Sequence, residues 1–391
     1  MKILFCKWGS MCETGMMLAL KKLGHTYIEL SKQSEDMDYD KEYLQEISAC
    51  IQSNADISCV MSANYIPIVA RACKVFQLPY LSWTADSPCT YLNSKTLSYN
   101  SNRVFLFDRM QFMKYSPQNK KNIFYLPLAG DPETIDMQTK NISKDEHKKY
   151  DCDISFIGSL YTEMCKYNEI ENKLSNYTKG YVEGLLSAQQ NVYGYNFLEE
   201  SMSKEWINRF TNEISLPQPT EDYNDDLYGT LADLYLGYKC TEQERIHILD
   251  ALSQNHNVDL YTLSDTSSVP KVHVKGIADS KTMMPKIFHC SKINLNMTNR
   301  AIKTGLPLRI FDIMSAGGFL MTNYQPEISE YFTIDKDLVA FESIPDLLEK
   351  VDFYLAHDDV RKQIARNGYD AIRRSHTYVH RLQMMFEMID M

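Results

Sequence analysis

The 391-residue sequence predicts an α/β protein made of two Rossmann-like halves. Short apolar runs alternate with amphipathic helical segments, which is the pattern of a doubly wound parallel sheet. The alternation begins at residue 1 and begins again at about residue 151, after a polar, lysine-rich stretch at 140–150 that we expect to be a linker. The length also exceeds what one hydrophobic core usually supports. Two domains that face each other across a cleft are therefore expected.

In the first half, strands are expected where apolar runs end at turn residues. They fall at 3–7, 27–30, 57–61, 79–83, 104–107 and 123–126, and helices are expected between them at 14–23, 41–52 and 66–76. The start of the chain is apolar for only a few residues and then turns. This pattern indicates a first strand and not a signal peptide.

The second half repeats the same organisation around a helical region. Strands are expected at 153–158, 258–262, 272–274, 293–296 and 338–341, with one more short buried strand inside 304–323. Residues 165–250 look mainly helical, with a break at 217–219, and helices close the chain at about 345–356, 358–373 and 377–390. We therefore expect a first domain at 1–150, a second at 151–375 with a helical insert at about 180–237, and a last helical segment at 376–391.

Charge and cysteine usage exclude several classes of protein. The net charge of −10 argues against broad binding to nucleic acid or to an anionic membrane. Residues 212–226 carry five acids and no base, which favours a solvated loop. The ten cysteines form no Cys-x-x-Cys pair, and no apolar run approaches the roughly 20 residues of a membrane helix. Reduced thiols in a cytoplasmic protein are the simplest interpretation.

No metal site is expected from the acidic motifs. The Asp-Cys-Asp run at 151–153 precedes a strand, which is the wrong side of a sheet for a metal–nucleotide site. The aspartates at positions 36, 38 and 40 lack the glycine and the last acid of a calcium loop. Both motifs are more simply solvated turns.

The most informative stretch of the sequence is 304–323. Pro307 suits the start of a helix, and Gly317 and Gly318 suit its end. Arg309 and Asp312 are three residues apart, so they share one face of this helix. A cation beside free backbone N–H groups suits a phosphate, and a carboxylate one turn later suits the hydroxyls of a ribose. The alternative is an ordinary surface ion pair.

Glycine-serine turns follow the first strand of each half. Gly9-Ser10 and Gly158-Ser159 would let the backbone approach a ligand and offer a hydroxyl to a phosphate, although a simple tight turn explains either equally well. No Gly-x-Gly-x-x-Gly or P-loop motif occurs. A dinucleotide-dependent dehydrogenase and a P-loop enzyme are therefore disfavoured.

Other candidate residues follow predicted strands. Asp86 comes just after a buried strand, beside Trp83, where a carboxylate could act as a general base and an indole could stack on a sugar; an Asx turn is the alternative. Asn64 lies at an equivalent strand end and could line the same cleft. Asn296 points to one side of its strand, followed by Arg300, and needs partners that a ligand or the backbone would supply.

The order of these motifs resembles the spore-maturation-protein-like glycosyltransferases. Three segments of the second half carry the resemblance, Phe156-Ile157-Gly158-Ser159, Ile293-Asn294-Leu295-Asn296 and the stretch from Pro307 to Gly317, and 82–88 and 125–129 resemble the domain that precedes it. The resemblance implies a GT-B fold whose last helix crosses back to the first domain, with a nucleotide-sugar donor held mainly by the second. It also implies that positive side chains, and no metal, stabilise the leaving diphosphate.

The sequence departs from the related retaining enzymes at one position. Those enzymes carry two glutamates around a seven-residue spacer, and the resemblance places Asp312 at the second and Thr304 at the first. The missing carboxylate leaves retention or inversion open.

We therefore expect a cytoplasmic, metal-independent hexosyl- or N-acetylhexosaminyltransferase that needs no cofactor. It would use a nucleotide-sugar, with UDP-sugar as the expected donor, and a protein or glycan as the acceptor. Asp86 is the expected base; Gly158, Ser159, Asn296, Arg300, Arg309 and Asp312 would bind the donor, and Gly9, Ser10, Asn64 and Trp83 would line the acceptor side. A nucleotide-sugar epimerase and a non-catalytic sugar- or protein-binding module remain as alternatives.

Overall fold

The computed structural model describes residues 1–34 and 36–391, and their contacts divide the chain into two compact units. Unit 1 comprises Met1–Ala129, Pro219–Asp225 and His376–Met391, and unit 2 comprises Gly130–Gln218 and Asp226–Ser375. The chain therefore leaves unit 2 and returns to it in the middle of the expected insert. None of the helices in the described residues is long and apolar enough to cross a membrane.

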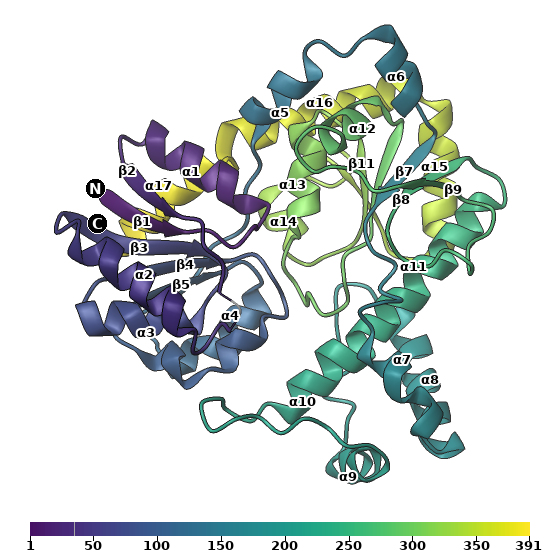
Figure 1. The fold of residues 1–391 in the computed structure, drawn as a ribbon. Helices are drawn as coiled ribbons and strands as arrows, with labels where there is room; N and C mark the ends of the chain where they lie inside the picture. The colour runs from purple at the N-terminus through teal and green to yellow at the C-terminus, as the bar shows by residue number, and fades with distance from the viewer. Residues whose placement is uncertain (35) are drawn as a thin grey trace. The chain divides into compact units, whose positions relative to one another are not determined.

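Unit 1 is a parallel sheet with helices on both faces (Figure 1). Its elements are β1 (Lys2–Cys6), α1 (Cys12–Lys22), β2 (Thr26–Leu30), α2 (Lys41–Gln52), β3 (Ile57–Ala63), α3 (Pro67–Phe76), β4 (Tyr80–Thr84), β5 (Asn102–Leu106), α4 (Arg109–Tyr115), β6 (Ile123–Tyr125) and α17 (Tyr378–Met388), with short 3₁₀ turns at Thr90–Asn93, Lys95–Ser98 and Ser116–Gln118. The strand order is β2-β1-β3-β4-β5-β6. The order reverses between β1 and β3, so the crevice at their carboxyl ends is where such a sheet binds ligands.

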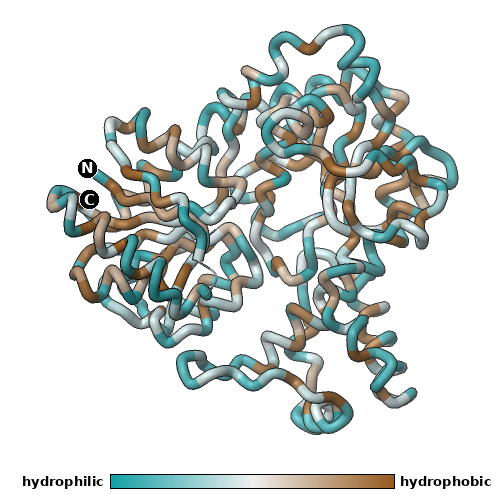
Figure 2. Tube along the Cα trace, in the orientation of Figure 1, coloured by the Kyte–Doolittle hydropathy of each residue, from teal (hydrophilic) through white to brown (hydrophobic). Residues whose placement is uncertain are grey.

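The core of unit 1 explains why the short apolar runs become strands. β1, β3 and β4 are buried over nearly their whole length, and Figure 2 shows the apolar residues of β1 and β3 as hydrophobic segments. The C-terminal helix α17 packs on α1, and the ring of Tyr378 meets Trp83 edge-on with centroids 5.8 Å apart. Residues 376–391, expected to cross back to the first domain, are part of this unit.

Unit 2 is a second parallel sheet of six strands. Its elements are α5 (Pro132–Thr139), α6 (Lys144–Tyr150), β7 (Ile154–Ile157), α7 (Lys166–Ile170), a 3₁₀ turn (Glu171–Lys173), α8 (Asn176–Gln190), α9 (Lys204–Glu213), α10 (Leu227–Thr230), a π-helix (Leu231–Gly237), α11 (Tyr238–Ser253), β8 (Val258–Tyr261), β9 (His273–Gly276), α12 (Met284–Cys290), β10 (Ile293–Asn296), α13 (Leu308–Ser315), β11 (Leu320–Asn323), α14 (Ile328–Tyr331), β12 (Val339–Phe341), α15 (Ile344–Ala356) and α16 (Asp358–Ser375). The predicted fold class, two parallel α/β units, is confirmed.

The sheet of unit 2 has the strand order β12-β11-β10-β7-β8-β9. This is the Rossmann order, and the strand order reverses between β7 and β10. Both strands are fully buried and pair in parallel from Ile154 and Ile293 onward. The residues that follow β7 and β10 therefore meet at the switch point of unit 2, where a ligand is expected.

The helices between β7 and β8 form a subdomain with its own hydrophobic core. Trp206 stacks on Phe210 and on Tyr181, with ring centroids 5.0 and 5.2 Å apart, in an apolar cluster that α7, α8, α9 and the π-helix share. The insert predicted at about 180–237 is therefore longer at its start, since α7 and α8 begin at Lys166 and Asn176.

Two segments and one domain boundary differ from the sequence-based expectation. Residues 144–150, expected to be linker, form α6, because the side chains of Ser143 and Glu146 cap its start reciprocally. The compact first unit also ends at Ala129, before the limit at residue 150 that the sequence suggests. The acidic stretch expected to be solvated contributes residues 219–225 to unit 1.

Replacing Gly15 by alanine should destabilise unit 1. A Cβ atom at Gly15 would overlap the ring of Tyr378, which is buried and packs against Trp83. Overpacking of this kind costs about 1–3 kcal/mol, which outweighs the gain of about 1 kcal/mol in helix propensity. Thermal denaturation should show a lower melting temperature for Gly15→Ala. Gly180→Ala in α8, where nothing lies within 4 Å of the new methyl group, should instead be neutral or stabilising. The same shift in both variants would contradict this packing.

Candidate functional site

Arg245 joins the two loops of the switch point of unit 2. Its side chain, from α11, donates one Nη hydrogen bond to the carbonyl of Ser159 after β7 and the other to the carbonyl of Met297 after β10. Its guanidinium also lies over the rings of Phe156 and Tyr161, 5.3 and 4.9 Å from their centroids. A single cation therefore fixes the distance between the two strand ends where a ligand is expected.

The charge of Arg245 is desolvated and is not neutralised by a contacting acid. The residue is only 8% exposed, and burial lowers the pKa of its guanidinium. Among residues 1–34 and 36–391, none of the ion pairs involves Arg245, and its Nε has no hydrogen-bond partner. Glu244 and Glu163 oppose this lowering of the pKa and Arg309 adds to it, so acids and a second cation both lie in the electrostatic neighbourhood of Arg245. A buried positive charge with no carboxylate in hydrogen-bond contact favours an anionic ligand.

Tyr161 holds an unusual backbone conformation in the loop after β7. Its φ is 68°, in the left-handed region that a bulky side chain rarely adopts. The phenol oxygen accepts a hydrogen bond of 2.8 Å from Asn299, in the loop after β10. Local strain of this kind persists where the surroundings hold it, often at a functional site. Tyr161 and Arg245 thus make two separate connections across the switch point.

Arg300, expected to contact the donor, is held by protein groups in this structure. Its Nε and Nη2 donate to both oxygens of Glu244, at 2.8 and 2.7 Å, and its Nη1 donates to the carbonyl of Val192. Both members of the pair are at least 93% buried, and the guanidinium also stacks on Tyr193. This bidentate pair fastens the loop after β10 to α11, and its role here is structural.

Gly158 and Ser159, the predicted phosphate turn, follow β7 directly. A Cβ at Gly158 would lie 3.2 Å from the ring of Phe156, so the turn leaves room for little more than glycine. The hydroxyl of Ser159 donates to Glu163 at 2.8 Å and accepts from the backbone N–H of Tyr161 at 2.6 Å. A phosphate at this turn would compete with Glu163 for that hydroxyl.

Asn296 is 4% exposed and serves the sheet in this structure. Its amide nitrogen donates to Thr298 at 3.1 Å and to Thr322 on β11 at 2.9 Å. The need for partners in an apolar strand is thus met by neighbouring side-chain hydroxyls, whereas the sequence had suggested a ligand or the backbone.

Arg309 and Asp312 lie on α13 as predicted, and they face each other. Arg309 Nη1 and Asp312 Oδ2 are 3.4 Å apart, and each side chain keeps about one fifth of its surface exposed. The helix begins at Leu308, with Pro307 as the extended residue before it. Burial raises the pKa of Asp312 to about 6, against the opposing effect of Arg309 and with a further rise from Asp131. The long, partly open pair leaves both groups able to bind a ligand.

A carboxylate lies beside Thr304, where the resemblance indicates that one is missing. The Thr304 hydroxyl donates to Glu327 Oε1 at 2.7 Å, and Glu327 is only 2% exposed. Gln325, two residues earlier, donates to the carbonyl of Ile302 at 3.3 Å. The loop after β11 therefore holds the loop that leads into α13.

In unit 1, Asn64 and Asp86 form the clearest polar constellation. Asn64 has a φ of 62°, and its Oδ1 accepts from the backbone N–H groups of Ala85 and Asp86. Its amide nitrogen donates to Asp86 Oδ2 at 2.6 Å. Asp86 is exposed, but the surrounding protein desolvates its carboxyl group enough to raise its pKa, which the hydrogen bond from Asn64 opposes. The two residues predicted at neighbouring strand ends are therefore brought together.

The remaining unit 1 candidates have other tasks. Trp83 is 2% exposed and donates to the carbonyl of Leu126, so it presents no ring face to a sugar, contrary to expectation. The backbone N–H groups of Trp8 and Gly9 are taken by the buried carboxylate of Glu13. Ser10 caps α1 through its carbonyl, which accepts from Glu13 N–H at 3.2 Å. The Gly9-Ser10 turn is thus satisfied internally.

Sequence reasoning missed Arg245, Glu244, Tyr161 and Glu327. Glu244 and Arg245 are adjacent on a helix with ordinary amphipathic spacing, so no local pattern distinguishes them from surface charges.

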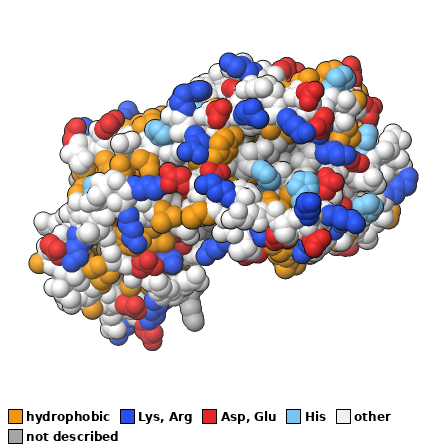
Figure 3. All heavy atoms as spheres, turned by 90° about the horizontal axis from the view of Figure 1, so that it is seen from above, with side chains coloured by type: hydrophobic (Ala, Val, Ile, Leu, Met, Phe, Trp, Pro, Cys, Tyr) orange, Lys and Arg blue, Asp and Glu red, His pale blue; other side chains and the backbone are white. Residues whose placement is uncertain are grey.

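In the described part of the chain, no three His, Cys, Asp or Glu side chains gather as a metal ion would require. Acidic and basic side chains are interspersed on the face that Figure 3 displays.

Breaking the Glu244–Arg300 pair should destabilise unit 2 strongly. Glu244→Ala would leave the buried guanidinium of Arg300 without its partner, and such a loss costs about 3–5 kcal/mol. Chemical denaturation should show this as a lower midpoint. Asp56→Ala, which breaks an exposed pair with Lys2, should cost less than about 1 kcal/mol. Similar costs for the two variants would contradict the structural role of Arg300.

Comparisons with known proteins agree with this geometry. A family model described as "Glycosyl transferase-like" matches residues 245–387, and no curated protein matches the sequence. A glycosyltransferase from Rickettsia africae ESF-5 is similar in structure at 12% identity, covering 99% of this chain and 98% of that chain with a TM-score of 0.53.

Two other solved structures are similar over their whole length. HepE from Anabaena, in complex with UDP and glucose, has 10% identity and a TM-score of 0.55, covering 100% of this chain and 99% of that chain. Sucrose-phosphate synthase from Thermosynechococcus elongatus has 9% identity and a TM-score of 0.54, covering 98% and 97%. The chain thus has the GT-B fold of glycosyltransferases, and its glycosyl transferase-like segment, residues 245–387, carries Arg245, Arg309 and Asp312.

Proposed function

We propose that this protein is a glycosyltransferase that takes a sugar from a nucleotide-diphosphate-sugar and transfers it to an acceptor hydroxyl or amide. The observation that carries the proposal is Arg245, a desolvated cation without a carboxylate partner at the switch point of unit 2. The glycosyl transferase-like match over residues 245–387 supports the same activity. HepE, of the same fold, was solved with UDP-glucose, which favours a UDP-hexose as the donor.

In the proposed complex, unit 2 binds the donor. The diphosphate lies near the Gly158-Ser159 turn, where Arg309 donates to it and the buried charge of Arg245 attracts it. Asp312 accepts hydrogen bonds from the two ribose hydroxyls. As the sugar leaves, negative charge grows on the diphosphate, and fixed cations stabilise it without having to reorganise. We propose that these side chains take the part that a metal ion plays in other transferases.

We propose that unit 1 activates the acceptor. Desolvation by the surrounding protein raises the pKa of Asp86, and a base of higher pKa removes a proton more readily. Asn64 donates one hydrogen bond to this carboxylate and accepts two from the backbone N–H groups of Ala85 and Asp86, which holds the carboxylate and its backbone together. The acceptor nucleophile would lose its proton to Asp86 as it attacks the anomeric carbon, and the bond from that carbon to the diphosphate would break. Membership of the spore-maturation-protein-like group, and a hexosyl or N-acetylhexosaminyl group as the sugar, are part of this proposal.

Removing the charge of Arg309 should weaken donor binding. A hydrogen bond to a charged group contributes about 1.5–3 kcal/mol, so Arg309→Met should raise the Kd for UDP by about 10-fold to 100-fold. Isothermal titration calorimetry with UDP measures this directly. Arg366→Met, which removes an exposed arginine of α16, is the matched control and should bind UDP like the wild type. Equal affinity in all three proteins would remove Arg309 from the site.

Donor binding should also depend on pH through Asp312. Its raised pKa of about 6 means that the carboxylate is ionised at pH 7.5 and mostly protonated at pH 5. Only the ionised form accepts hydrogen bonds from both ribose hydroxyls, so affinity for UDP-glucose should fall as the pH drops through about 6. The two phosphates of UDP-glucose stay ionised over this range, so the ligand does not add its own titration. Asp312→Asn should bind weakly and without this pH dependence; a wild-type affinity that is flat between pH 5 and 7.5 would contradict the role.

Turnover separates the enzyme from a sugar-binding module. A glycosyltransferase slowly hydrolyses its donor or transfers it to an acceptor, whereas a binding module retains UDP-glucose unchanged. Release of UDP from UDP-glucose should be lost in Asp86→Asn while UDP binding to unit 2 is unchanged. Tight binding with no turnover in the wild type would favour the module, and appearance of an isomerised donor would favour the epimerase.

A further inference from the structure

The acidic segment Pro219–Asp225 is docked on unit 1 by a continuous set of contacts. Its backbone pairs with the chain that follows β4, through an isolated antiparallel bridge between Tyr223 and Ser94. The N–H of Lys95 donates to the carbonyl of Asp222 at 2.8 Å, and the N–H of Asn224 donates to the carbonyl of Asn93 at 2.8 Å. This is the geometry of a short added strand, in which main-chain hydrogen bonds provide the attachment.

Asp222 anchors the segment to the helical side of unit 1. Its Oδ2 accepts a hydrogen bond of 2.6 Å from the hydroxyl of Tyr39, and its Oδ1 lies 3.3 Å from Nη2 of Arg71. The guanidinium of Arg71 stacks on the ring of Tyr39, 4.4 Å from its centroid. The pKa of Asp222 is lowered, first by the hydrogen bond from Tyr39 and then by Arg71. The acidic charge is therefore paired, which a solvated loop would not require.

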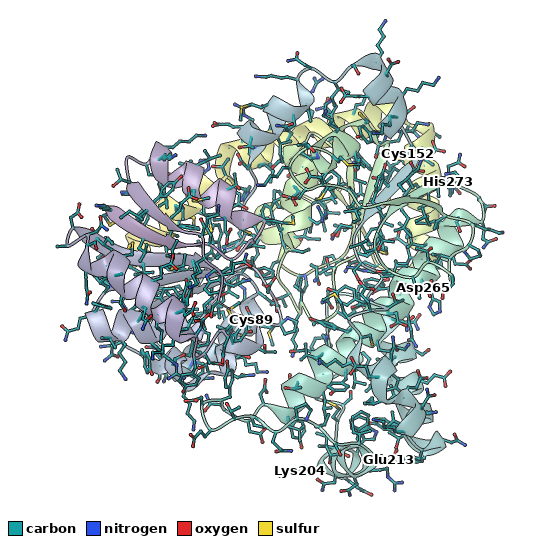
Figure 4. All side chains as sticks on the ribbon, in the orientation of Figure 1. Cys89, Cys152, Lys204, Glu213, Asp265 and His273 are labelled. Carbon is teal, nitrogen blue, oxygen red and sulfur yellow. The ribbon has the colours of Figure 1, made fainter. Side chains whose placement is uncertain are left out.

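Tyr223 connects the same segment to the loop after β2. Its hydroxyl donates to Asp38 Oδ2 at 2.8 Å, and burial raises its pKa well above the ordinary value. The charge of Asp38 and the side chains of Tyr91 and Cys89 also act on this phenol. Cys89, labelled in Figure 4, belongs to the loop that follows β4. Tyr223 therefore lies between the loops that end β2 and β4.

The loop after β4 is the one that carries Asp86. It runs from Ala85 to the 3₁₀ turn Thr90–Asn93, and its start is held by Asn64 and by Gln111, which donates to the Asp86 carbonyl at 3.2 Å. Its end is held by the docked segment, through Asn93 and Ser94. The loop of the proposed base is thus fixed at both ends, once by unit 1 itself and once by a segment from the middle of the insert.

We propose that Asp222 and Tyr223 are positioning residues that hold the Asp86 loop and the loop after β2 in the geometry that binds the acceptor. The proposal rests on the proposed function for its catalytic consequence. Its structural part, namely that the segment orders these two loops, is supported by the contacts alone. The insert then has a defined task in acceptor use, which neither the donor site nor the sheet of unit 2 performs.

The test combines hydrogen exchange with kinetics on the full-length protein. The double variant Asp222→Ala/Tyr223→Phe removes both side-chain anchors, and Asp222→Asn keeps the hydrogen bond from Tyr39 while removing the charge. Hydrogen exchange, read by mass spectrometry, should be at least 10-fold faster at residues 85–95 in the double variant, and close to the wild type in Asp222→Asn. Asp225→Ala, which removes an exposed acid of the same segment, is the matched control and should leave exchange unchanged.

Kinetics then separate positioning from general loss of structure. UDP release from UDP-glucose should fall about 10-fold in kcat in the double variant, whereas KM for UDP-glucose and the Kd for UDP stay at the wild-type value. Unchanged exchange at residues 85–95 would overturn the docking role. Faster exchange with unchanged kcat would overturn the positioning role, and loss of UDP affinity together with kcat would show general unfolding and overturn it too. A wild type that never turns over UDP-glucose would defeat the proposed function, and the exchange measurement would still decide the ordering of the loops.

Discussion

The cation of Arg245, held between two carbonyl groups at the switch point of unit 2, is the interaction on which the donor site depends. Parallel strands that diverge at a reversal of strand order leave a crevice at their carboxyl ends. In this protein the crevice is bounded by the loops after β7 and β10, and α11 spans both: Arg245 reaches Ser159 and Met297, and Glu244 holds Arg300. The same helix turn thus sets the width of the crevice and fixes one of its walls. It also leaves the guanidinium of Arg245 without a contacting carboxylate, near where a diphosphate would lie.

The division of labour among charged residues follows from burial. The Glu244–Arg300 pair is closed and bidentate, so its two charges cancel and it acts as a fastener. The Arg309–Asp312 pair is long and partly exposed, so each member can exchange its partner for a ligand at small cost. Asp222 pairs with Tyr39 and Arg71 and holds the segment Pro219–Asp225 within unit 1. Three ion pairs of similar composition therefore have different roles: the first stabilises the fold, the second is available to a ligand, and the third holds a loop.

The strands were predictable because they are apolar runs bounded by turn residues, and such runs are buried in parallel sheets whatever the rest of the chain does. Arg309 and Asp312 were predictable because their spacing on one helix is a local property. Arg245 was not, because its partners, Ser159 and Met297, are 86 and 52 residues away and no local pattern indicates them. Trp83 was misplaced for the same reason: its burial depends on Tyr378, near the opposite end of the chain. The acidic run at 219–225 was expected to be solvated because its composition gives no sign of a partner. Its contacts with Tyr39 and Arg71 depend on the fold.

The proposed donor site requires that the switch point of unit 2 binds the diphosphate of a nucleotide-sugar. A crystal structure of the protein with UDP would show where the diphosphate binds. It should lie within hydrogen-bond distance of Arg309 and against the Gly158-Ser159 turn, with both ribose hydroxyls on Asp312. UDP bound elsewhere, or a diphosphate that leaves Arg309 paired only with Asp312, would contradict it.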